Sequence, residues 1–334
     1  MIPIGLRELS DPSTPRVIVR PYESWERLWR AEEAHEYFEE ACRRRHEFGL
    51  TVADFRALNG WIDSIYNLPA GGAYSNGVPR GRLLNPRNFF GSESSGKALR
   101  SWHRADLGYT VATGVSQLLD QSANFYTLTQ ATATNQPVTS ATGLNGRFCL
   151  SFDASNDYLS YPSGFAATVA GGNDKPFASW SVARFSTDVL TTTKYSYLWG
   201  FGYSGGNSPY IEFYGGYTQT AWVCSKCSNT NVNVSTAGTS PGVAANTNYF
   251  IEYYHTGTTS EVIVNGVSCT MSNGGALDAA QADVNTAAIH ALPRSTVVSS
   301  NAALLWGEQV FASGKPTALH RFLMTTYKTR QWGF

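Results

Sequence analysis

The glutamates in the C-terminal two thirds of the chain are the first residues to consider as catalysts. A retaining glycosidase needs two carboxyl groups roughly 5–5.5 Å apart, one as nucleophile and one as acid/base. Beyond residue 105 no glutamate has another acid two or four positions away, which is the spacing that would place both on one face of a strand. These glutamates are Glu212, Glu252, Glu261 and Glu308. The pattern argues against a hydrolase, and we predict that the protein is not an enzyme.

The pair Cys224-Ser-Lys-Cys227 is the sharpest local motif. A structural zinc site needs four ligands, and only the isolated Cys149 and Cys269 are left to complete one. A redox pair of this spacing belongs at a strand-to-helix junction, whereas this one lies among Ser, Thr and Asn in β-rich sequence. We interpret the pair as two small residues at a hairpin, with a disulfide as the alternative.

Asp153 and Asp157, in the run Phe-Asp-Ala-Ser-Asn-Asp, have side chains suited to calcium, which prefers loop carboxylates and carbonyls. Asp and Asn are also the usual residues of Asx-turns, so both interpretations stay open. No other cofactor is predicted. The six histidines are dispersed, and no Ser-His-Asp or metal-ligand spacing stands out.

Ten aromatic residues lie between Tyr195 and Trp222. Together with nearby Asn and Asp, such rings can form a platform for a sugar, and aromatics are equally favoured in strands as core and sheet surface. Trp199, Phe201 and Tyr203 alternate strictly, so they should share one face. The candidate glycan-binding residues are Trp199, Tyr203, Tyr210, Tyr214, Tyr217 and Trp222.

The elements that carry these residues fall into two physically different segments. Residues 1–105 hold 15 basic and 13 acidic side chains of the chain's 25 and 25, and the rest is rich in Ser, Thr, Gly, Asn and Tyr. Residues 1–20 read as an extended, proline-containing arm that would become ordered on a partner. Two helices are predicted near 24–47 and 51–67, the second opened by a capping-box pattern, Thr51-x-x-Asp54.

These helices would form a hairpin over residues 21–68, followed by a Gly/Pro-rich linker over 69–98. A hairpin of this size buries too little surface to hold so many aromatic side chains unaided. It must therefore pack on the jelly roll or on another chain, and we predict that it attaches the protein to a larger particle. The candidate attachment residues are Trp25, Trp29, Phe55 and Trp61.

From residue 99 to 334 the pattern changes to short alternating strands. Ser101 to Tyr161 reads SWHRADLGYTV, LLDQSANFYTLTQ and GLNGRFCLSFDASNDYLSY, and further strands follow at 177–186, 249–266 and 302–311 before a closing helix at 317–332. These segments resemble the laminin-G-like, concanavalin-A-like jelly-roll domains of secreted bacterial proteins and bacteriophage particle proteins. The resemblance implies a mainly β, antiparallel two-sheet jelly roll. The fold hosts lectins, hydrolases and structural modules alike, and the Glu-x-Asp-x-Glu type motif of its hydrolases has no match in this sequence.

Composition narrows the class of protein further. The net charge is zero, which favours neither nucleic acid nor a polyanionic partner. Five scattered cysteines imply no disulfide framework. The N-terminus lacks the apolar run of a signal peptide, and no apolar stretch is long enough to span a membrane. A phage particle protein needs no export signal, because it is assembled in the host cytoplasm.

We therefore predict a bacteriophage virion structural protein, anchored by its N-terminal region and displaying a lectin-like jelly roll. We expect it to be a decoration protein of the head, a neck protein, or a component of the baseplate or tail. Its expected partners are capsid, neck or tail proteins, further copies of itself, and a host surface glycan. Two alternatives stay open: a host-glycan-binding adhesion module of a tail appendage, and a cell-wall or capsule polysaccharide hydrolase.

Overall fold

The chain folds as two units, one formed by residues 1–90 and 316–329 and the other by residues 91–315 and 330–334. The computed structural model describes residues 25–66, 85–90, 98–122, 124–171, 175–190, 195–216, 220–228, 233–277, 284–295 and 302–334. Within these ranges, the side chains of 25–31, 63–66, 88, 190, 233 and 234 are not part of the description. The predicted arm over residues 1–20 lies outside the described residues.

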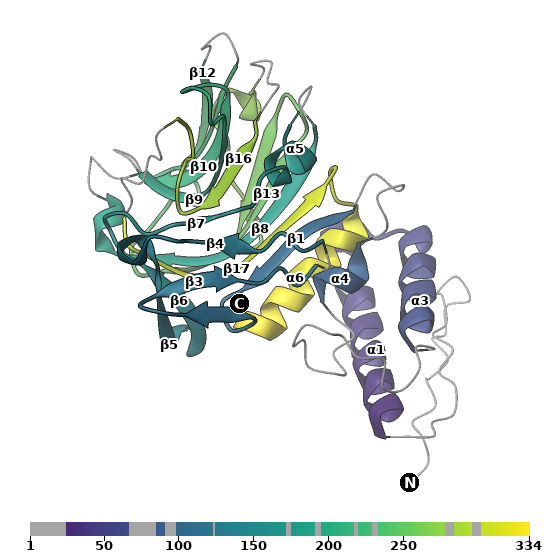
Figure 1. The fold of residues 1–334 in the computed structure, drawn as a ribbon. Coiled ribbons are helices and arrows are strands. Elements are labelled where there is room, and N and C mark those ends of the chain that lie inside the picture. Colours follow the sequence, from purple (N-terminus) through teal and green to yellow (C-terminus); the bar gives the residue numbers. More distant parts are fainter. Residues whose placement is uncertain are drawn as a thin grey trace. The chain divides into compact units, whose positions relative to one another are not determined.

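The larger unit contains two antiparallel sheets that face each other (Figure 1). Sheet I runs in the order β15-β14-β13-β8-β17-β6-β5, and β1 pairs with β17. Its strands are β1 (Leu99–Arg104), β5 (Val138–Leu144), β6 (Arg147–Phe152), β8 (Phe177–Phe185), β13 (Asn248–His255), β14 (Ser260–Val264), β15 (Val267–Ser268) and β17 (Leu304–Ser313).

Sheet II runs in the order β12-β11-β10-β9-β16-β7-β4-β3-β2. Its strands are β2 (Tyr109–Val111), β3 (Val115–Leu118), β4 (Leu128–Thr129), β7 (Leu159–Ser160), β9 (Tyr195–Gly202), β10 (Tyr210–Gly216), β11 (Trp222–Cys227), β12 (Asn233–Gly238) and β16 (Thr286–Ile289). A short helix, α5 (Phe165–Val169), and 3-10 turns at Ala133–Asn135, Thr187–Leu190 and Ser272–Gly275 lie in the connections.

The core lies between the two sheets and is built from the inward-facing residues of each strand. Phe177 and Tyr253 of sheet I meet Trp199 and Phe213 of sheet II, with the Trp199–Tyr253 and Phe213–Tyr253 ring centroids 5.0 and 5.1 Å apart. Two sheets that bury one face each against the other are the defining feature of a β-sandwich. The predicted mainly β, two-sheet jelly roll is confirmed.

The strands that the alternating pattern predicted are present. The predicted strand over 177–186 is β8, the hairpin over 249–266 is β13 and β14 with Ile251 opposite Val264, and the strand over 302–311 is β17. All of them belong to sheet I, where β17 pairs with β8 along its whole length.

The smaller unit is helical and contains α1 (Trp25–Arg43), α2 (Arg45–Phe48), α3 (Val52–Tyr66), α4 (Pro86–Phe89) and most of α6 (Ala318–Trp332). The predicted capping box is present, since the Thr51 backbone N–H donates to Asp54 at 2.9 Å and the Asp54 N–H donates back to Thr51 Oγ1 at 3.3 Å. Gly49 ends α2 with a φ of 65°, which a glycine adopts without strain.

Two boundaries of this unit differ from the sequence-based prediction. The region predicted as a linker contains α4, whose Phe89 packs edge-on against Trp61 and Tyr327. The closing helix, predicted within the jelly roll, belongs to the helical unit up to Thr329. Phe322 of this helix packs against Phe48 with ring centroids 5.7 Å apart. Both segments supply the aromatic side chains that the hairpin alone lacks.

None of the described helices is both long enough and apolar enough to cross a membrane.

Candidate functional site

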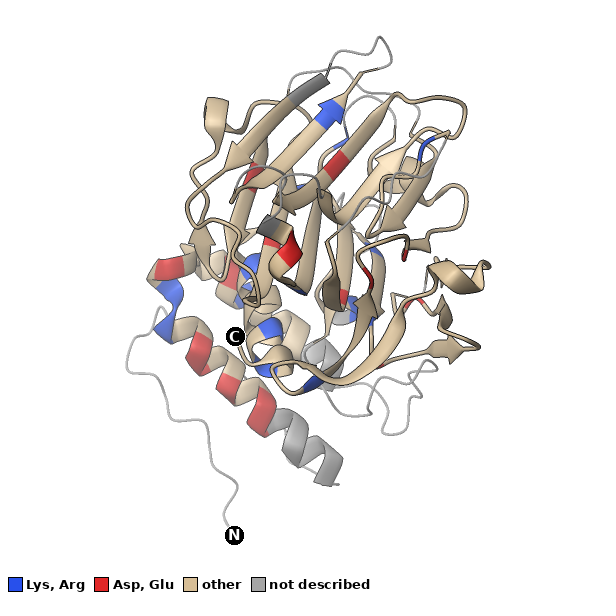
Figure 2. Ribbon diagram, turned by 90° about the vertical axis from the view of Figure 1, so that its left-hand side faces the viewer, with Lys and Arg blue, Asp and Glu red and all other residues tan. Residues whose placement is uncertain are grey.

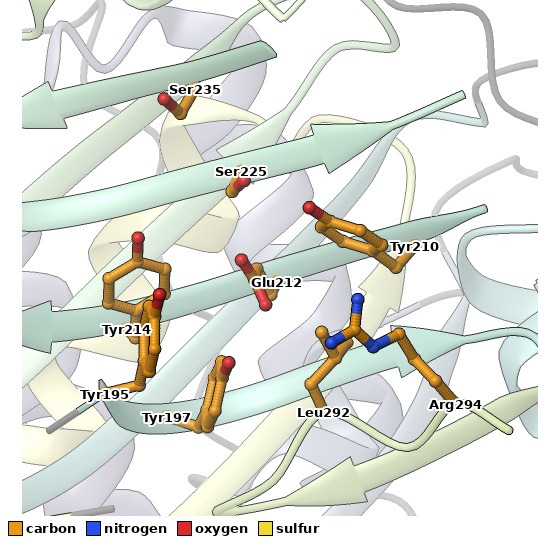
Figure 3. A pocket seen from close by; sticks show the side chains of 9 residues that line it. All are labelled: Tyr195, Tyr197, Tyr210, Glu212, Tyr214, Ser225, Ser235, Leu292 and Arg294. Carbon is orange, nitrogen blue, oxygen red and sulfur yellow. The ribbon is translucent and has the colours of Figure 1, made fainter. Parts of the chain in front are cut away.

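A pocket of about 300 Å³ opens on the face of sheet II that points away from the core (Figure 3). Strands β9, β10, β11 and β12 supply most of its lining, and the segment after β16 supplies the rest. The volume is at the lower end of the range for small-molecule sites. Its lining residues are Tyr195, Tyr197, Tyr210, Glu212, Tyr214, Ser225, Ser235, Leu292 and Arg294.

Strand alternation explains how β10 divides its side chains between core and pocket. Ile211 and Phe213 belong to the core, so Tyr210, Glu212 and Tyr214 must point to the other face. The pocket therefore has a carboxyl group flanked by a tyrosine on each side along one strand. Figure 3 shows Glu212 lying between these two tyrosines.

A β-bulge in β9 places two further tyrosines beside this strand. Phe213 pairs with Trp199, but Tyr214 pairs with Tyr197, which leaves Leu198 as the extra residue. The extra residue shifts the alternation, so that Trp199 faces the core while Tyr197 faces the pocket. Four tyrosine side chains consequently surround Glu212.

The wall of the pocket opposite β11 comes from the chain that follows β16. This segment crosses the outer face of β9 at two glycines. A Cβ atom at Gly200 would lie 2.6 Å from the carbonyl oxygen of Ala291, and one at Gly202 would overlap the carbonyl oxygen of Pro293. The crossing brings Leu292 into the pocket lining. Thr286 Oγ1 donates to the Pro293 carbonyl at 2.9 Å and so ties the segment down.

Glu212 is 5% exposed, and its surroundings favour the protonated carboxyl. Burial raises its pKa to about 7, although the charge of Arg294 and hydrogen bonding by Tyr197 and Ser225 oppose the rise. Its Oε2 atom has no hydrogen-bond partner among the described residues. A buried acceptor without a donor is costly, so a ligand that supplied one would gain that free energy.

The tyrosine rings pack on each other and leave their hydroxyl groups at the pocket. Tyr195 and Tyr197 stack at 5.6 Å, and Tyr214 meets both edge-on at 5.2 and 5.7 Å. Burial raises the pKa of Tyr210 to about 12 and those of Tyr197 and Tyr214 further. These hydroxyls therefore stay protonated at neutral pH and can both donate and accept hydrogen bonds.

Arg294 brings a positive charge to the pocket. Its guanidinium carbon lies 5.3 Å from the centroid of the Tyr210 ring, a cation–π arrangement. Its Nη1 donates to the carbonyl oxygen of Asn207 at 3.4 Å, and its Nε has no acceptor among the described residues. The side chain is thus oriented by weak contacts, and its Nη2 group has no acceptor in the part of the chain that the structure describes.

The structure brings together only part of the predicted glycan-binding set. Tyr210 and Tyr214 line the pocket, whereas Tyr203 is partly exposed beyond the end of β9 and is absent from the lining. Trp199 and Trp222 were wrongly placed, because both are fully buried between the sheets and neither can present a face to a sugar. Tyr217 lies outside the described residues.

Other pocket residues were not predicted. Tyr195 and Tyr197 belong to the aromatic run on which the prediction rested but were not among the candidate residues, and Arg294 is distant in sequence. Glu212 had a usable signal, because it is a single charge within the apolar and aromatic run Tyr210 to Tyr214.

The four glutamates weighed as catalysts occupy four different environments. Glu308 accepts hydrogen bonds from the indoles of Trp102 and Trp332, each at 2.6 Å. Glu252 accepts one from Trp180 Nε1 at 3.3 Å and another from the Tyr254 hydroxyl. Glu261 forms an ion pair with Lys315 at 3.1 Å on the surface. Glu212 alone of the four lines the pocket.

Asp153 and Asp157 both hold their own loop together. Asp153 Oδ1 accepts from the backbone N–H groups of Ser155, Asn156 and Asp157 at 2.9–3.3 Å, and Asp157 Oδ2 accepts from that of Asp153 at 2.8 Å. This is the Asx-turn role. Within the described part of the chain, no three His, Cys, Asp or Glu side chains gather as they would around a metal ion. Calcium binding stays a prediction that these contacts do not favour.

Cys224 and Cys227 lie within β11 rather than at a hairpin turn. Residues three apart in a strand point to opposite faces, and accordingly Cys224 belongs to the core while Cys227 packs with the pocket tyrosines. Both are free thiols. The pair cannot close a disulfide or share a metal ion in this strand.

The predicted attachment residues are only partly described. Phe55 is 5% exposed and packs edge-on against Phe38 at 5.6 Å, so it supports the helical unit from within and was wrongly taken as a docking residue. Trp61 is partly exposed and packs against Phe89. The side chains of Trp25 and Trp29 lie outside the described residues.

No family model matches the chain, and no curated protein matches it. Among solved structures, the binding domain of botulinum neurotoxin serotype G matches with a TM-score of 0.49 at 9% identity over 70% of this chain and 51% of that chain. The binding domain of Paraclostridial Mosquitocidal Protein 1 gives 0.48 at 8% identity, covering 70% and 52%. Trypanosoma rangeli sialidase in complex with the inhibitor DANA gives 0.46 at 12% identity, covering 69% and 33%.

The chain spans about half or less of the length of these structures. At such low identities no functional inference follows from the likeness.

Proposed function

We propose that the jelly roll is a carbohydrate-binding module that acts without catalysis, and that the helical unit fixes it to a larger particle such as a bacteriophage virion. The observation that carries the first part is the buried Oε2 atom of Glu212, which has no donor among the described residues and belongs to a pocket lined by four tyrosines. Native proteins rarely leave such a group unpaired without a functional reason.

The chemistry of the pocket fits a sugar better than an apolar ligand. Its lining presents tyrosine and serine hydroxyls, a carboxyl and a guanidinium, which together can donate to and accept from the many hydroxyls of a saccharide. Because Tyr195, Tyr197 and Tyr214 already pack on each other at 5.2–5.7 Å, recognition would rest on hydrogen bonds at their hydroxyl ends rather than on stacking between the rings.

The absence of catalysis is proposed from the same residues. Glycoside hydrolysis uses two carboxyl groups that flank the scissile bond. Among the described lining residues, Glu212 is the single carboxylic acid. The other three glutamates beyond residue 105 interact with other side chains instead: two accept hydrogen bonds from indoles or a tyrosine hydroxyl, and the third pairs with a lysine.

Binding of the full-length protein to immobilised bacterial surface polysaccharides tests the module. Glu212→Ala and Tyr197→Phe should each weaken binding by roughly tenfold, the worth of a hydrogen bond to a charged or buried group. Glu261→Ala, on the surface of sheet I, is the matched control and should bind normally. Unchanged binding by Glu212→Ala would place the site elsewhere, and new reducing ends released from the polysaccharide would establish a hydrolase.

The attachment role rests on the contrast in charge between the two units. Acidic bands recur along α1 in Figure 2, and Glu32, Glu36 and Glu39 are exposed on this helix. A charged helix presented by a separately packed unit suits a polar protein interface. In this proposal, copies of the chain displayed on one particle multiply weak sugar contacts by effective concentration.

An antibody against the protein should label intact particles if this assignment holds. Changing the three exposed glutamates to lysine should remove the protein from particles while leaving its sugar binding intact, because the pocket residues belong to the other unit. Normal incorporation of the triple variant would rule out this face of α1 as the attachment surface.

A further inference from the structure

Glu212 and Arg294 line the same pocket but are not paired with each other. The described residues show no ion pair between them, and Arg294 acts on Glu212 only through its charge, which lowers the pKa of that carboxyl. Each retains unused hydrogen-bonding capacity, since Oε2 of Glu212 lacks a donor and Nε of Arg294 lacks an acceptor among the described residues. One small pocket therefore contains an unsatisfied acceptor and an unsatisfied cationic donor.

A ligand that satisfies both groups must be negative or strongly accepting at one end and must carry a donor at the other. Arg294 offers a planar set of N–H donors that matches a carboxylate, and planar bidentate recognition is what distinguishes arginine from lysine. Within the described chain, the only hydrogen bond of this guanidinium runs from Nη1 to the carbonyl oxygen of Asn207. Its Nη2 group has no acceptor in the described ranges and is the donor offered to an anion.

We propose that the pocket binds an acidic sugar, a saccharide residue whose carboxylate contacts Arg294 and whose hydroxyl group donates to Glu212. This inference rests on the proposed carbohydrate-binding function and specifies its ligand class. The described lining holds one arginine and no lysine. One guanidinium balances a monoanion, whereas a sugar phosphate with its second charge would add repulsion against Glu212.

Neutral and basic sugars fit the pair of groups less well. A neutral sugar would leave the guanidinium without a counter-charge in a partly buried pocket. The ammonium group of an amino sugar would favour Glu212 but would be repelled by Arg294. An acidic sugar suits both groups, because its carboxylate is attracted to Arg294 and one of its hydroxyl groups can donate to Glu212 even when that carboxyl is uncharged.

Proton uptake by Glu212 should accompany the binding of an anion. The pKa of this carboxyl is about 7, so near neutral pH it is divided between charged and uncharged forms. The uncharged form admits an anionic ligand without repulsion and can itself donate a hydrogen bond.

Other ionisable groups around Glu212 do not titrate in the same range. Burial raises the pKa values of the Tyr197, Tyr210 and Tyr214 hydroxyls and of the Cys227 thiol, and an arginine guanidinium stays charged. The groups that face Glu212 are Tyr197 on β9, Tyr210 and Tyr214 on β10, Ser225 and Cys227 on β11, and Arg294 after β16. Affinity for an acidic sugar should fall as the pH rises from about 6 to about 8, by up to about tenfold if only the protonated form binds.

The test compares uronic-acid-containing capsular polysaccharides with the same polymers after chemical reduction of their carboxyl groups, using full-length protein. The acidic form should bind and the reduced form should bind at least about tenfold more weakly. Arg294→Gln should lower affinity for the acidic form by a similar factor and should leave any residual binding to the reduced form unchanged. Arg294→Lys, which keeps the charge but not the planar donors, should recover part of the loss.

Glu212→Gln should remove the pH dependence, and Glu261→Gln should preserve it. Equal binding of acidic and reduced polymers, abolished by Glu212→Ala, would overturn the acidic ligand while leaving the sugar-binding module intact. Tighter binding of an amino-sugar polymer as the pH rises would likewise overturn it. If neither polymer binds at any pH, both the ligand class and the module are wrong.

Discussion

Glu308 in sheet I and Glu212 in sheet II are both buried, but their carboxyl groups differ in how completely they are hydrogen-bonded. The two oxygens of Glu308 each accept an indole N–H at 2.6 Å, from Trp102 and Trp332. Burial raises the pKa of the Glu212 carboxyl, and one of its oxygens has no donor among the described residues. A buried carboxylate with its acceptors filled stabilises the fold. A buried carboxyl group with an acceptor oxygen that lacks a donor indicates a place where a ligand can bind.

The largest effect expected from this contrast is on stability. Glu308→Ala should lower the free energy of unfolding by about 3–5 kcal/mol, because it leaves two buried indole N–H groups without their acceptor. Glu212→Ala should change it by less than about 1 kcal/mol near pH 6, since little is lost with a poorly satisfied group. Urea unfolding of both variants measures the difference. Equal losses would remove the distinction between the two carboxyl groups.

A smaller effect should appear in the pH dependence of stability. The folded-state pKa of Glu212 is about 7, whereas that of an unfolded glutamate is about 4.3. The folded state therefore binds the extra proton, and stability is full below the unfolded value and is lost as the pH rises through 7. Between about pH 5 and about pH 8 the wild type should lose about 2–3 kcal/mol relative to Glu212→Gln.

The comparison with Glu212→Gln isolates this group from others. Burial also raises the pKa of Asp157, to about 6, but that residue is present in both proteins and cancels in the difference. Parallel stability curves for the wild type and Glu212→Gln would show that Glu212 is an ordinary, solvated acid.

The smallest effect is expected at an exposed glutamate. Glu261 pairs with Lys315 at 3.1 Å, where their side chains are 37% and 54% exposed. Surface ion pairs of this kind contribute little, so Glu261→Gln should shift the unfolding free energy by no more than about 0.5 kcal/mol. A loss as large as that of Glu308→Ala would mean that burial is not what separates these glutamates.

The sequence allowed the fold to be predicted because the relevant signals are local. Alternation marks β8, β13 and β17 directly, and the Thr51–Asp54 capping box marks the start of α3. What escaped prediction depends on contacts between distant segments. Nothing near Ala318 says that α6 belongs chiefly with the helical unit rather than with the sheets.

The candidate site was predicted in part for the same reason. Tyr210 and Tyr214 follow the alternation of β10, and both belong to the predicted set and to the pocket lining. Trp199 was assigned to the wrong face because alternation gives the period of a strand but not which face is buried, and the bulge at Leu198 changes the phase for the tyrosines before it. Arg294 reaches the pocket through a crossing that no local pattern encodes.

Gly200 and Gly202 let one connection lie flat on β9 and bring Leu292 and Arg294 to the pocket. The carboxyl and the tyrosines come from the strands, while the cation comes from this connection. Mutation can therefore exchange the charge that selects a ligand without disturbing the strands that carry Glu212. Related chains that kept the two glycines but varied residues 292–295 would share one framework and differ in which surface polymer they recognise.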